Sequence, residues 1–263
     1  MLTRMSHTEV PMYNYGNNGP YGNNRPFGRN NGFGSRYQYQ TLQPGMERVQ
    51  SSSLITKVMG LLAFSFIFAS IGTFVGFLLP LTLSSYWVVV IAGFVVLIAL
   101  NFLIQRPGIN LFLLYLFTFL EGLSLSPIIS YYAQTSSNIL GEAFLLTALT
   151  AIGLSVYSWT TKRDFSRLGD YLFFGLLLLL LAGIFGIFLH GLFQTTLFGL
   201  LFAVVGVAIF SGYVLFYVQR AKYMADTLPN AIGLTVSLFI TLINLFLYIL
   251  EILSILQGGN RRR

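Results

Sequence analysis

Seven long apolar runs follow one another between Leu54 and Gln257, and they constrain this chain more than any other feature. A helix needs about 20 mainly apolar residues to cross the hydrocarbon layer of a bilayer. The expected membrane-spanning helices are residues 55–79, 86–104, 109–132, 139–160, 170–190, 196–218 and 230–257. Pro80 ends the first run, and residues 106–108 separate the second from the third. Because the linkers are short, consecutive helices are expected to run antiparallel.

Composition also indicates a membrane protein. Hydrophobic residues make up 55% of the chain, charged residues 9%, and the mean hydropathy is +0.73, whereas soluble domains carry about 25% charged residues. The predicted fold class is therefore all-α: a polytopic membrane protein with seven transmembrane helices, in contact with a lipid bilayer. The chain has no cysteine, and its two histidines, His7 and His190, lie far apart. We therefore expect no enzyme and no resident cofactor.

The sequence predicts three regions. Residues 1–53 are rich in Asn, Gly, Tyr and Arg and too poor in apolar residues to form a core, so we expect a disordered cytoplasmic tail. Residues 54–257 form the membrane domain, and residues 258–263 form a basic C-terminal tail. The N-terminal tail lacks the apolar stretch of a secretory signal peptide. Nucleic acid is not an expected partner, because there is no folded basic domain to bind it.

Basic residues alternate between the two ends of the predicted bundle. They precede the first helix and follow the second, fourth and sixth, whereas residues 80–85, 133–138 and 191–195 carry no charge. The positive-inside rule therefore predicts a cytoplasmic N-terminus, and we expect a bacterial plasma membrane. The C-terminal residues 261–263 break this pattern if the last helix crosses fully, and a re-entrant last segment would remove the conflict. Full crossing is favoured, because residues 230–257 are long enough at about 1.5 Å per residue.

The last apolar run carries a polar seam. Its members are Ser237, Thr241, Asn244, Tyr248 and Glu251, and their spacing of +4, +3, +4 and +3 places them on one helix face. Unpaired Asn and Glu side chains are costly in lipid, so this face should contact protein or water. We therefore expect the last helix to be central, with the other helices packed around it. The alternative is an ordinary bundle helix whose polar face is satisfied by its neighbours.

Glu121 lies midway along the third run and shares a helix face with Thr118 and Ser124. Ser126 and Pro127 follow, and the proline frees a backbone carbonyl that needs a polar partner. A carboxyl group near the middle of a membrane is expected to be neutral, paired or facing water. Two interpretations remain open: a proton- or cation-sensing site on a pathway, or a protonated carboxyl group that is hydrogen-bonded to a neighbouring helix.

The connection between the fourth and fifth runs, SWTTKRDFSRLGD, mixes charges in a short loop. Short polar side chains can cap helix ends, and basic side chains suit the phosphate surface of a membrane. The candidate caps are Thr160, Thr161, Asp164 and Ser166, and the basic residues are Lys162, Arg163 and Arg167.

Three patterns together resemble the Bax inhibitor-1 / YccA-type membrane family. They are Glu-Gly-x-Ser-x-Ser-Pro at residues 121–127, Thr-Thr-Lys-Arg-Asp-Phe-Ser at 160–166 with Gly169 after it, and Phe-Ser-Gly-Tyr-Val-Leu at 210–215 with Leu-Ile-Asn-Leu-Phe-Leu at 242–247. The resemblance covers roughly residues 50–257. It implies a seven-helix fold with the last helix surrounded by the other six, and a pH-sensitive calcium leak or channel-like activity. In some members it implies regulation of a membrane protease, or suppression of stress-induced cell death.

The resemblance also implies a gate made of two aspartates, one late in the sixth helix and one in the seventh. In this chain these positions hold Tyr217 and Thr241, and neither side chain ionises near neutral pH. Altered pH gating is therefore expected, with any titratable control moved to Glu121 or Glu251. The complete set of pathway or gate candidates is Glu121, Ser124, Ser126, Tyr217, Thr241, Asn244 and Glu251.

Two hypotheses for the function follow. The first is a cation leak or channel-like protein with calcium as the transported ion. The second is a non-conducting regulator that binds a membrane protease or another membrane protein through helix–helix contacts. A retinal protein is excluded because the last run contains no lysine for a Schiff base. A secondary transporter is disfavoured, because the sequence shows no repeated half and no pair of broken helices.

Overall fold

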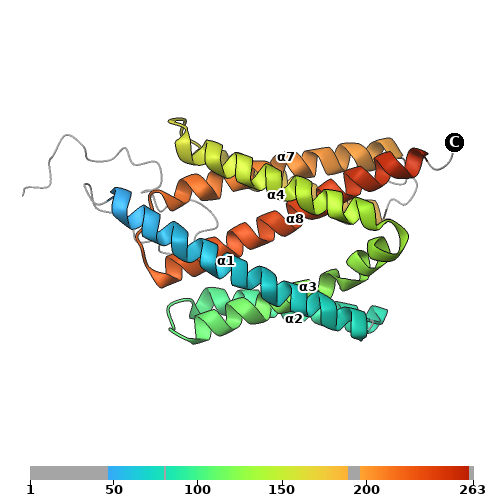
Figure 1. Cartoon of the computed structure of the whole chain (residues 1–263), viewed down its shortest axis with the longest axis horizontal. Helices are drawn as coiled ribbons and strands as arrows, with labels where there is room; N and C mark the ends of the chain where they lie inside the picture. Colours follow the sequence, from blue (N-terminus) through green and yellow to red (C-terminus); the bar gives the residue numbers. More distant parts are fainter. Residues whose placement is uncertain (1–46, 80, 189–195, 261–263) are drawn as a thin grey trace, which may run out of the picture.

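The computed structural model of the chain describes residues 47–79, 81–188 and 196–260. This part of the chain contains seven α-helices and no strand, and all seven helices are long and apolar enough to cross a membrane. The predicted all-α membrane fold is therefore confirmed (Figure 1). The helices are α1 (Glu47–Leu78), α2 (Leu83–Leu103), α3 (Ile109–Thr135), α4 (Ser137–Thr160), α5 (Leu168–Phe188), α7 (Thr196–Ala221) and α8 (Leu228–Asn260).

Several helix ends differ from the expected ones. Helix α1 begins at Glu47, so residues 47–53, which we expected in the disordered tail, are helical. Helix α2 begins earlier than expected because Thr82 caps it, with its side chain accepting a hydrogen bond from the backbone N–H of Ser85 at 3.3 Å. Helix α8 continues to Asn260. The rest of the N-terminal tail and residues 261–263 lie outside the described residues.

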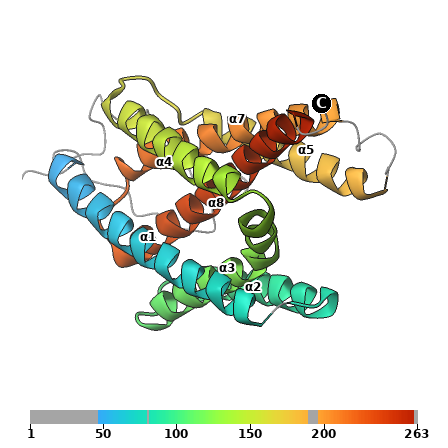
Figure 2. The ribbon, with the colours of Figure 1, turned by 45° about the vertical axis from the view of Figure 1, so that its right-hand side comes forward.

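The helices form two groups of three with α8 between them (Figures 1 and 2). In the first group α3 packs against both α1 and α2, and in the second group α7 packs against both α4 and α5. Helix α8 packs against α7, α1, α4 and, more narrowly, α3. The expected central position of the last helix is confirmed, but α2 and α5 lie further out, packed on α3 and α7. The two groups share one packing pattern and run in opposite directions, a symmetry that the sequence did not reveal.

Glycines allow α1 and α3 to approach closely. A Cβ atom built on Gly72 would lie 2.1 Å from the carbonyl oxygen of Phe119, and one on Gly122 would lie 1.9 Å from that of Ala69. Thr73 Oγ1 donates a hydrogen bond to the carbonyl oxygen of Gly122 at 2.8 Å across the same interface. Close backbone contact of this kind stabilises helix pairs in membranes.

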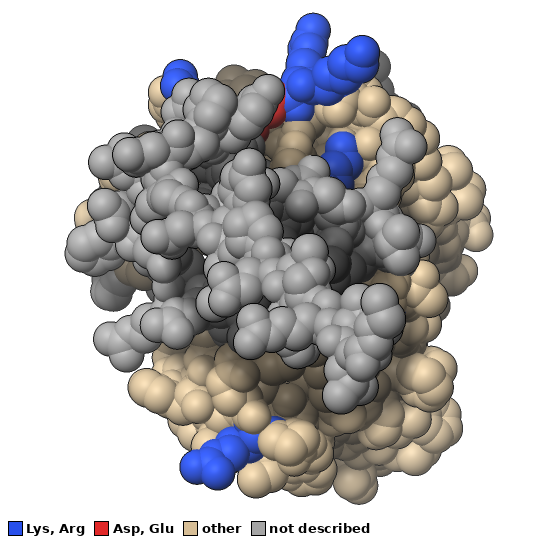
Figure 3. All heavy atoms as spheres, turned by 90° about the vertical axis from the view of Figure 1, so that its left-hand side faces the viewer, with Lys and Arg blue, Asp and Glu red and all other residues tan. Residues whose placement is uncertain are grey.

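Helix α8 is one continuous helix of 33 residues. A re-entrant segment would have to reverse direction within the bundle, so that alternative is wrong. The described lysine and arginine side chains belong to segments at the end of the bundle where α1 begins and α7 turns into α8, and Figure 3 shows several of them on that face. We call this the basic end. Its described lysine and arginine side chains are Lys57, Arg106, Lys162, Arg163, Arg167, Arg220 and Lys222.

Candidate functional site

The polar seam of α8 faces α7 at its basic-end half. Ser237 forms a side-chain hydrogen bond with Tyr217 of α7, and its own Oγ donates to the carbonyl oxygen of Gly233 at 3.0 Å. One turn further on, Thr241 is buried and its Oγ1 donates to the carbonyl oxygen of Ser237 at 2.7 Å. Ser237 thus links the two expected gate positions. Our expectation that this face contacts protein is confirmed here.

Tyr217 is held in place by a second tyrosine. Its ring stacks on that of Tyr213, one turn earlier in α7, with ring centres 5.6 Å apart. The described hydrogen bond of Tyr217 to α8 runs to Ser237, one turn before Thr241. At the positions where the resemblance implies two carboxylates, this chain has a network of hydroxyl groups.

The other half of the seam is aromatic and acidic. Asn244 Nδ2 donates to the carbonyl oxygen of Ile240 in its own helix at 2.8 Å. The ring of Tyr248 lies over Gly206 of α7, where a Cβ atom would be only 2.5 Å from the ring, and stacks on Phe210 with centres 5.7 Å apart. Glu251 is half-buried one turn beyond Tyr248. The tyrosine packing shows that only a small residue fits at Gly206.

Glu121 is half-buried on α3. Phe117, one turn earlier, makes an edge contact with Phe239 of α8 at 6.2 Å between ring centres, so this side of α3 is directed toward the central helix. Within the described residues the Glu121 carboxyl group makes no hydrogen bond or salt bridge, and Ser124 Oγ donates to the backbone carbonyl of Glu121 at 2.8 Å. The hydrogen bond to a neighbouring helix, one of the two interpretations, is not present in this structure.

Ser126 supplies the polar partner for the backbone carbonyl group that Pro127 leaves without its helical hydrogen bond. The proline removes the helical hydrogen bond to the carbonyl of Leu123 four residues earlier. Ser126 Oγ donates to that carbonyl oxygen at 2.8 Å, so the freed acceptor has its partner. Ser126 is also buried against Gly76 of α1, where a Cβ atom would lie 2.0 Å from the Ser126 oxygen. Ser126 therefore supports the helix and its packing.

The loop between α4 and α5 is fastened to α7 by Gln219, which sequence reasoning did not single out. The side chain is buried, accepts a hydrogen bond from the backbone N–H of Phe165 and donates one to the carbonyl oxygen of Arg163, both at 2.5 Å. The sequence did offer a signal for this contact, because Gln219 is a polar residue at the end of a largely apolar helix. This contact fixes the path of the segment from Thr160 to Asp164.

Of the four expected caps, only Thr161 occupies a described cap position, and the others form hydrogen bonds with residues close to them in the sequence. Thr161 is the C-cap of α4 and its Oγ1 accepts from the backbone N–H of Arg163 at 3.3 Å. Asp164 accepts from the backbone N–H of Ser166 at 2.8 Å, while Thr160 Oγ1 donates to the carbonyl oxygen of Val156 at 2.9 Å. Lys162, Arg163 and Asp164 are exposed. The loop is thus a capped turn with an exposed basic surface.

Lys222 joins the end of α7 to the end of α4. Its ammonium group donates to the carbonyl oxygen of Ser158 at 2.7 Å and lies 5.4 Å from the centre of the Trp159 ring. Ser158 Oγ in turn donates to the carbonyl oxygen of Leu215 at 2.7 Å. Burial lowers the pKa of Lys222 from its ordinary value, because desolvation disfavours the charged form.

An ion pair ties α1 to the segment between α7 and α8. Lys57 Nζ donates to both carboxylate oxygens of Asp226, at 2.9 and 3.0 Å. Partial burial acts to raise the pKa of Asp226, but hydrogen bonds from Ser53 and Lys57 and the charge of Lys57 hold that pKa below its ordinary value. Asn230 Nδ2 donates to the carbonyl oxygen of Ala225 at 2.8 Å in the same segment. The entry to α8 is therefore fixed by polar contacts.

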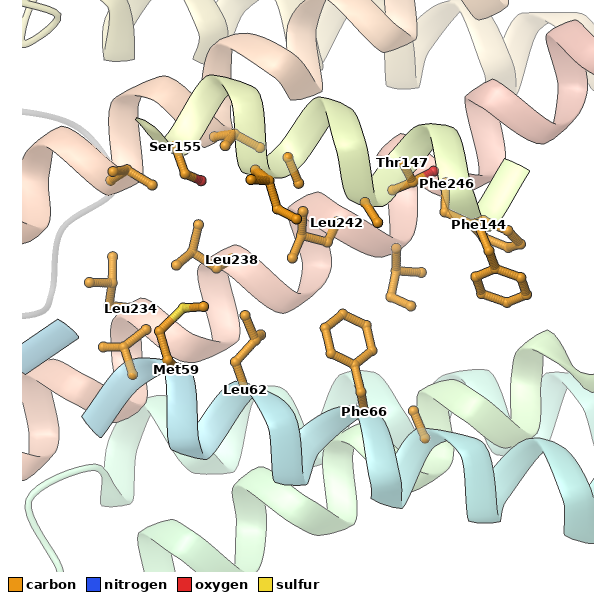
Figure 4. Close-up of a pocket in the computed structure, with 18 of the residues that line it drawn as sticks. Met59, Leu62, Phe66, Phe144, Thr147, Ser155, Leu234, Leu238, Leu242 and Phe246 are labelled. Atoms are coloured by element: carbon orange, nitrogen blue, oxygen red, sulfur yellow. The ribbon is translucent and has the colours of Figure 1, made fainter. Parts of the chain in front are cut away.

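A large apolar cavity is lined by a different face of α8, which carries Leu234, Leu238 and Leu242 and not the residues of the polar seam. Its volume is about 1090 Å³, its walls are α1 and α4, and α8 forms its floor together with part of α7 (Figure 4). Leu238 and Leu242 of α8 point into it. None of the seven pathway candidates lines this cavity. Within the described residues no group of three or more His, Asp or Glu side chains could hold a metal ion.

These features define a class: a multi-pass membrane protein in which two groups of three helices flank an apolar central helix that carries a polar seam. A model of the family described as "Inhibitor of apoptosis-promoting Bax1" matches residues 51–258. The chain belongs to this family, the Bax inhibitor-1 family, as the resemblance implied.

Individual relatives agree with this assignment. An uncharacterized protein of Campylobacter jejuni is 32% identical over 226 residues, covering 82% of this chain and 94% of the relative. The protein named Bax inhibitor 1 of Schizosaccharomyces pombe is 33% identical over 179 residues, covering 66% of this chain and 64% of the relative. An uncharacterized membrane protein of Vibrio cholerae is 32% identical over 148 residues, covering 56% of this chain and 64% of the relative. The chain thus spans less than two thirds of the Schizosaccharomyces and Vibrio proteins.

Proposed function

We propose that this protein is a cation leak or channel-like protein for Ca²⁺ that lacks the carboxylate pair implied by the family resemblance. The observation that carries the proposal is the half-buried Glu121 carboxyl group, within a membrane-spanning helix and without a partner among the described residues. Carboxyl groups are rare in such helices and mark ion or proton pathways. The polar seam of α8 supplies further oxygen atoms inside the bundle; it faces α7, on the side of α8 away from Phe239.

In this proposal the contact between Tyr217 and Ser237 closes the basic end of the path. Opening would require α7 and α8 to separate there, exposing Thr241 and then Asn244. Because a tyrosine hydroxyl and a serine hydroxyl stay neutral near pH 7, this closure does not respond to mild acid. Any acid response then arises at Glu121 or Glu251, the carboxyl groups of the proposed path.

The test is Ca²⁺ flux into liposomes that contain the purified protein. Glu121→Gln should lower the flux several-fold, because the amide keeps the shape of the side chain but removes its charge. The matched control is Glu142→Gln, since Glu142 is exposed at a helix end and only accepts a hydrogen bond from Gln257. Unchanged flux in Glu121→Gln, or no wild-type flux above empty liposomes between about pH 5 and about pH 8, contradicts the proposal.

The second candidate is a non-conducting regulator that binds a membrane protease or a stress factor. The observation that favours it is that Ser237, Thr241 and Asn244 all donate to carbonyl groups of their own helix. A seam satisfied in this way needs no ion or water. The family description and the name of the Schizosaccharomyces relative refer to inhibition of Bax. Copurification from the native membrane without any protein partner would count against this candidate.

We further propose that the basic end faces the cytoplasm, in a bacterial plasma membrane. The support is the position of the described lysine and arginine side chains at one end of the bundle, which the positive-inside rule assigns to the cytoplasm. We propose no catalytic reaction and no resident cofactor. A cysteine introduced at Lys162 should react with a membrane-impermeant thiol reagent only after intact cells are opened, and labelling in intact cells would reverse the orientation.

A further inference from the structure

We propose that the cavity between α1 and α4 is a binding site for one membrane phospholipid, with its acyl chains in the cavity and its phosphate beside Lys222. This inference does not depend on ion conduction. The site combines three properties: an apolar cavity large enough for a ligand, an opening toward the lipid, and a basic group beside one end. Ligand sites in proteins have volumes of about 300–1,000 Å³, and this cavity reaches about 1090 Å³.

The walls of the cavity suit hydrocarbon and not water. Several of its hydroxyl groups donate to backbone carbonyl oxygens: Ser70 Oγ to that of Phe66, Thr147 Oγ1 to that of Ala143, and Thr73 Oγ1 to those of Ala69 and Gly122. Phe66 and Leu242 are among the apolar side chains that point inward (Figure 4). Apolar cavities exclude water. In a membrane, the molecules available to occupy this cavity are the hydrocarbon chains of lipids.

The cavity opens toward the lipid. Met59 and Phe74 of α1 are 59% and 60% exposed, Ile152 and Val156 of α4 are 63% and 57% exposed, and all four line the cavity. These side chains form the two edges of the opening, so an acyl chain can enter sideways from the bilayer. The far end is narrowed by Phe144, whose ring stacks on Phe246 with centres 4.4 Å apart.

The polar end of the cavity has the charge that a phosphate needs. Trp159, Thr160 and Ala221 line the cavity at the basic end, and the Lys222 ammonium group lies over the Trp159 ring at 5.4 Å. An ammonium group has three N–H donors, and its described hydrogen bond goes to Ser158. An adjacent phosphate would accept a further hydrogen bond and would offset the desolvation of this charge.

The two tryptophans of the chain provide the test. Trp159 lines the cavity and is 40% exposed, whereas Trp87 is 55% exposed on α2 and does not line it. In detergent, phosphatidylglycerol with brominated acyl chains should quench Trp159, measured in a Trp87→Phe variant, with saturation at one lipid per protein. Trp87, measured in a Trp159→Phe variant, should be quenched only in proportion to the bulk lipid. Identical quenching curves would mean bulk lipid only and would overturn the proposal.

Variants separate the two parts of the site. Lys222→Gln should raise the half-saturating lipid concentration about five-fold, the contribution of one basic side chain near a lipid headgroup, while Lys222→Arg should restore it. Ala151→Phe, which fills the cavity, should abolish saturable quenching in protein that keeps the wild-type circular dichroism spectrum. A brominated diacylglycerol has the same chains but no phosphate. Its affinity should be low, and it should be the same for wild type and for Lys222→Gln.

Three results would contradict the assignment. Equal affinity for phospholipid and diacylglycerol would show that the site does not bind the phosphate group. Saturable quenching that survives in folded Ala151→Phe would place the lipid elsewhere. The preparation could contain a second polypeptide in a 1:1 ratio, with Trp159 not quenched by the brominated lipid. That result would show that a helix of another protein occupies the cavity.

Discussion

At the scale of single residues, most polar side chains in the membrane helices are satisfied by a carbonyl of their own helix. The sequence predicted the seam of α8 and the need for a partner near Pro127, because helix periodicity and proline geometry are local properties. It did not predict which residues complete the contacts between helices. Ser237 was known to lie on the seam, but its hydrogen bond to Tyr217 depends on how α7 and α8 pack. Gln219 was missed for the same reason, since its partners lie more than fifty residues away.

Gln219 should be important for stability. Gln219→Leu keeps the volume but leaves the backbone N–H of Phe165 and the carbonyl of Arg163 without their partner, which we expect to cost about 1–3 kcal/mol of unfolding free energy. The measurement is the thermal unfolding midpoint in detergent. Gln105→Leu is the control, because Gln105 is exposed at the same end of the bundle. Equal midpoints for the two variants would show that the loop is held by other contacts.

The ion pair between Lys57 and Asp226 should make stability depend on pH in acid. The pKa of Asp226 is lower in the folded protein than its ordinary value, so the stabilisation is complete above about pH 4. It is lost as the pH falls through the folded pKa. The pair is partly exposed, so the effect should be about 1 kcal/mol or less. Unfolding midpoints of wild type and Asp226→Asn should converge between about pH 6 and about pH 3. Parallel curves would contradict this role of the pair.

At the scale of helices, α1 and α3 form the closest pair, and their glycines explain it. Gly72 and Gly76 give α1 a small-residue face, but such pairs are common in glycine-rich membrane chains. Gly122 identifies α3 as the partner, because its missing side chain leaves room for the Ala69 carbonyl group. Local spacing can show that a helix has a small-residue face, and only the three-dimensional structure shows which helix meets it.

Gly72→Ala should destabilise the α1–α3 pair. The added Cβ atom would lie 2.1 Å from the Phe119 carbonyl oxygen, a backbone atom that moves only if α3 moves. We expect a loss of about 1–3 kcal/mol, measured as a lower thermal unfolding midpoint in detergent. Gly153→Ala is the control, because a Cβ atom there meets nothing within 4 Å, and alanine favours a helix over glycine. If both variants unfold at the same temperature, the glycine contact is not what stabilises this pair.

At the scale of the whole molecule, the sequence predicted the number of helices, the central place of the last helix and the family. These properties follow from hydropathy, from the polar seam and from the motifs. It did not predict the inverted arrangement of the two groups, because packing can repeat without a repeat in the sequence. Nor did it predict the apolar cavity, which α1, α4, α7 and α8 form together. The candidate path residues and the lining of this cavity have no residue in common.

The most direct test of the account is the pH profile of Ca²⁺ flux in liposomes for wild type and for the double variant Tyr217→Asp/Thr241→Asp. We expect the double variant to create or strengthen pH-dependent flux, because two carboxylates would replace hydroxyl groups at the contact between α7 and α8. Tyr217→Asn/Thr241→Asn has nearly the same shape without titratable groups, and its profile should follow that of wild type. If all three profiles coincide, these residues are not a gate and the central claim is wrong.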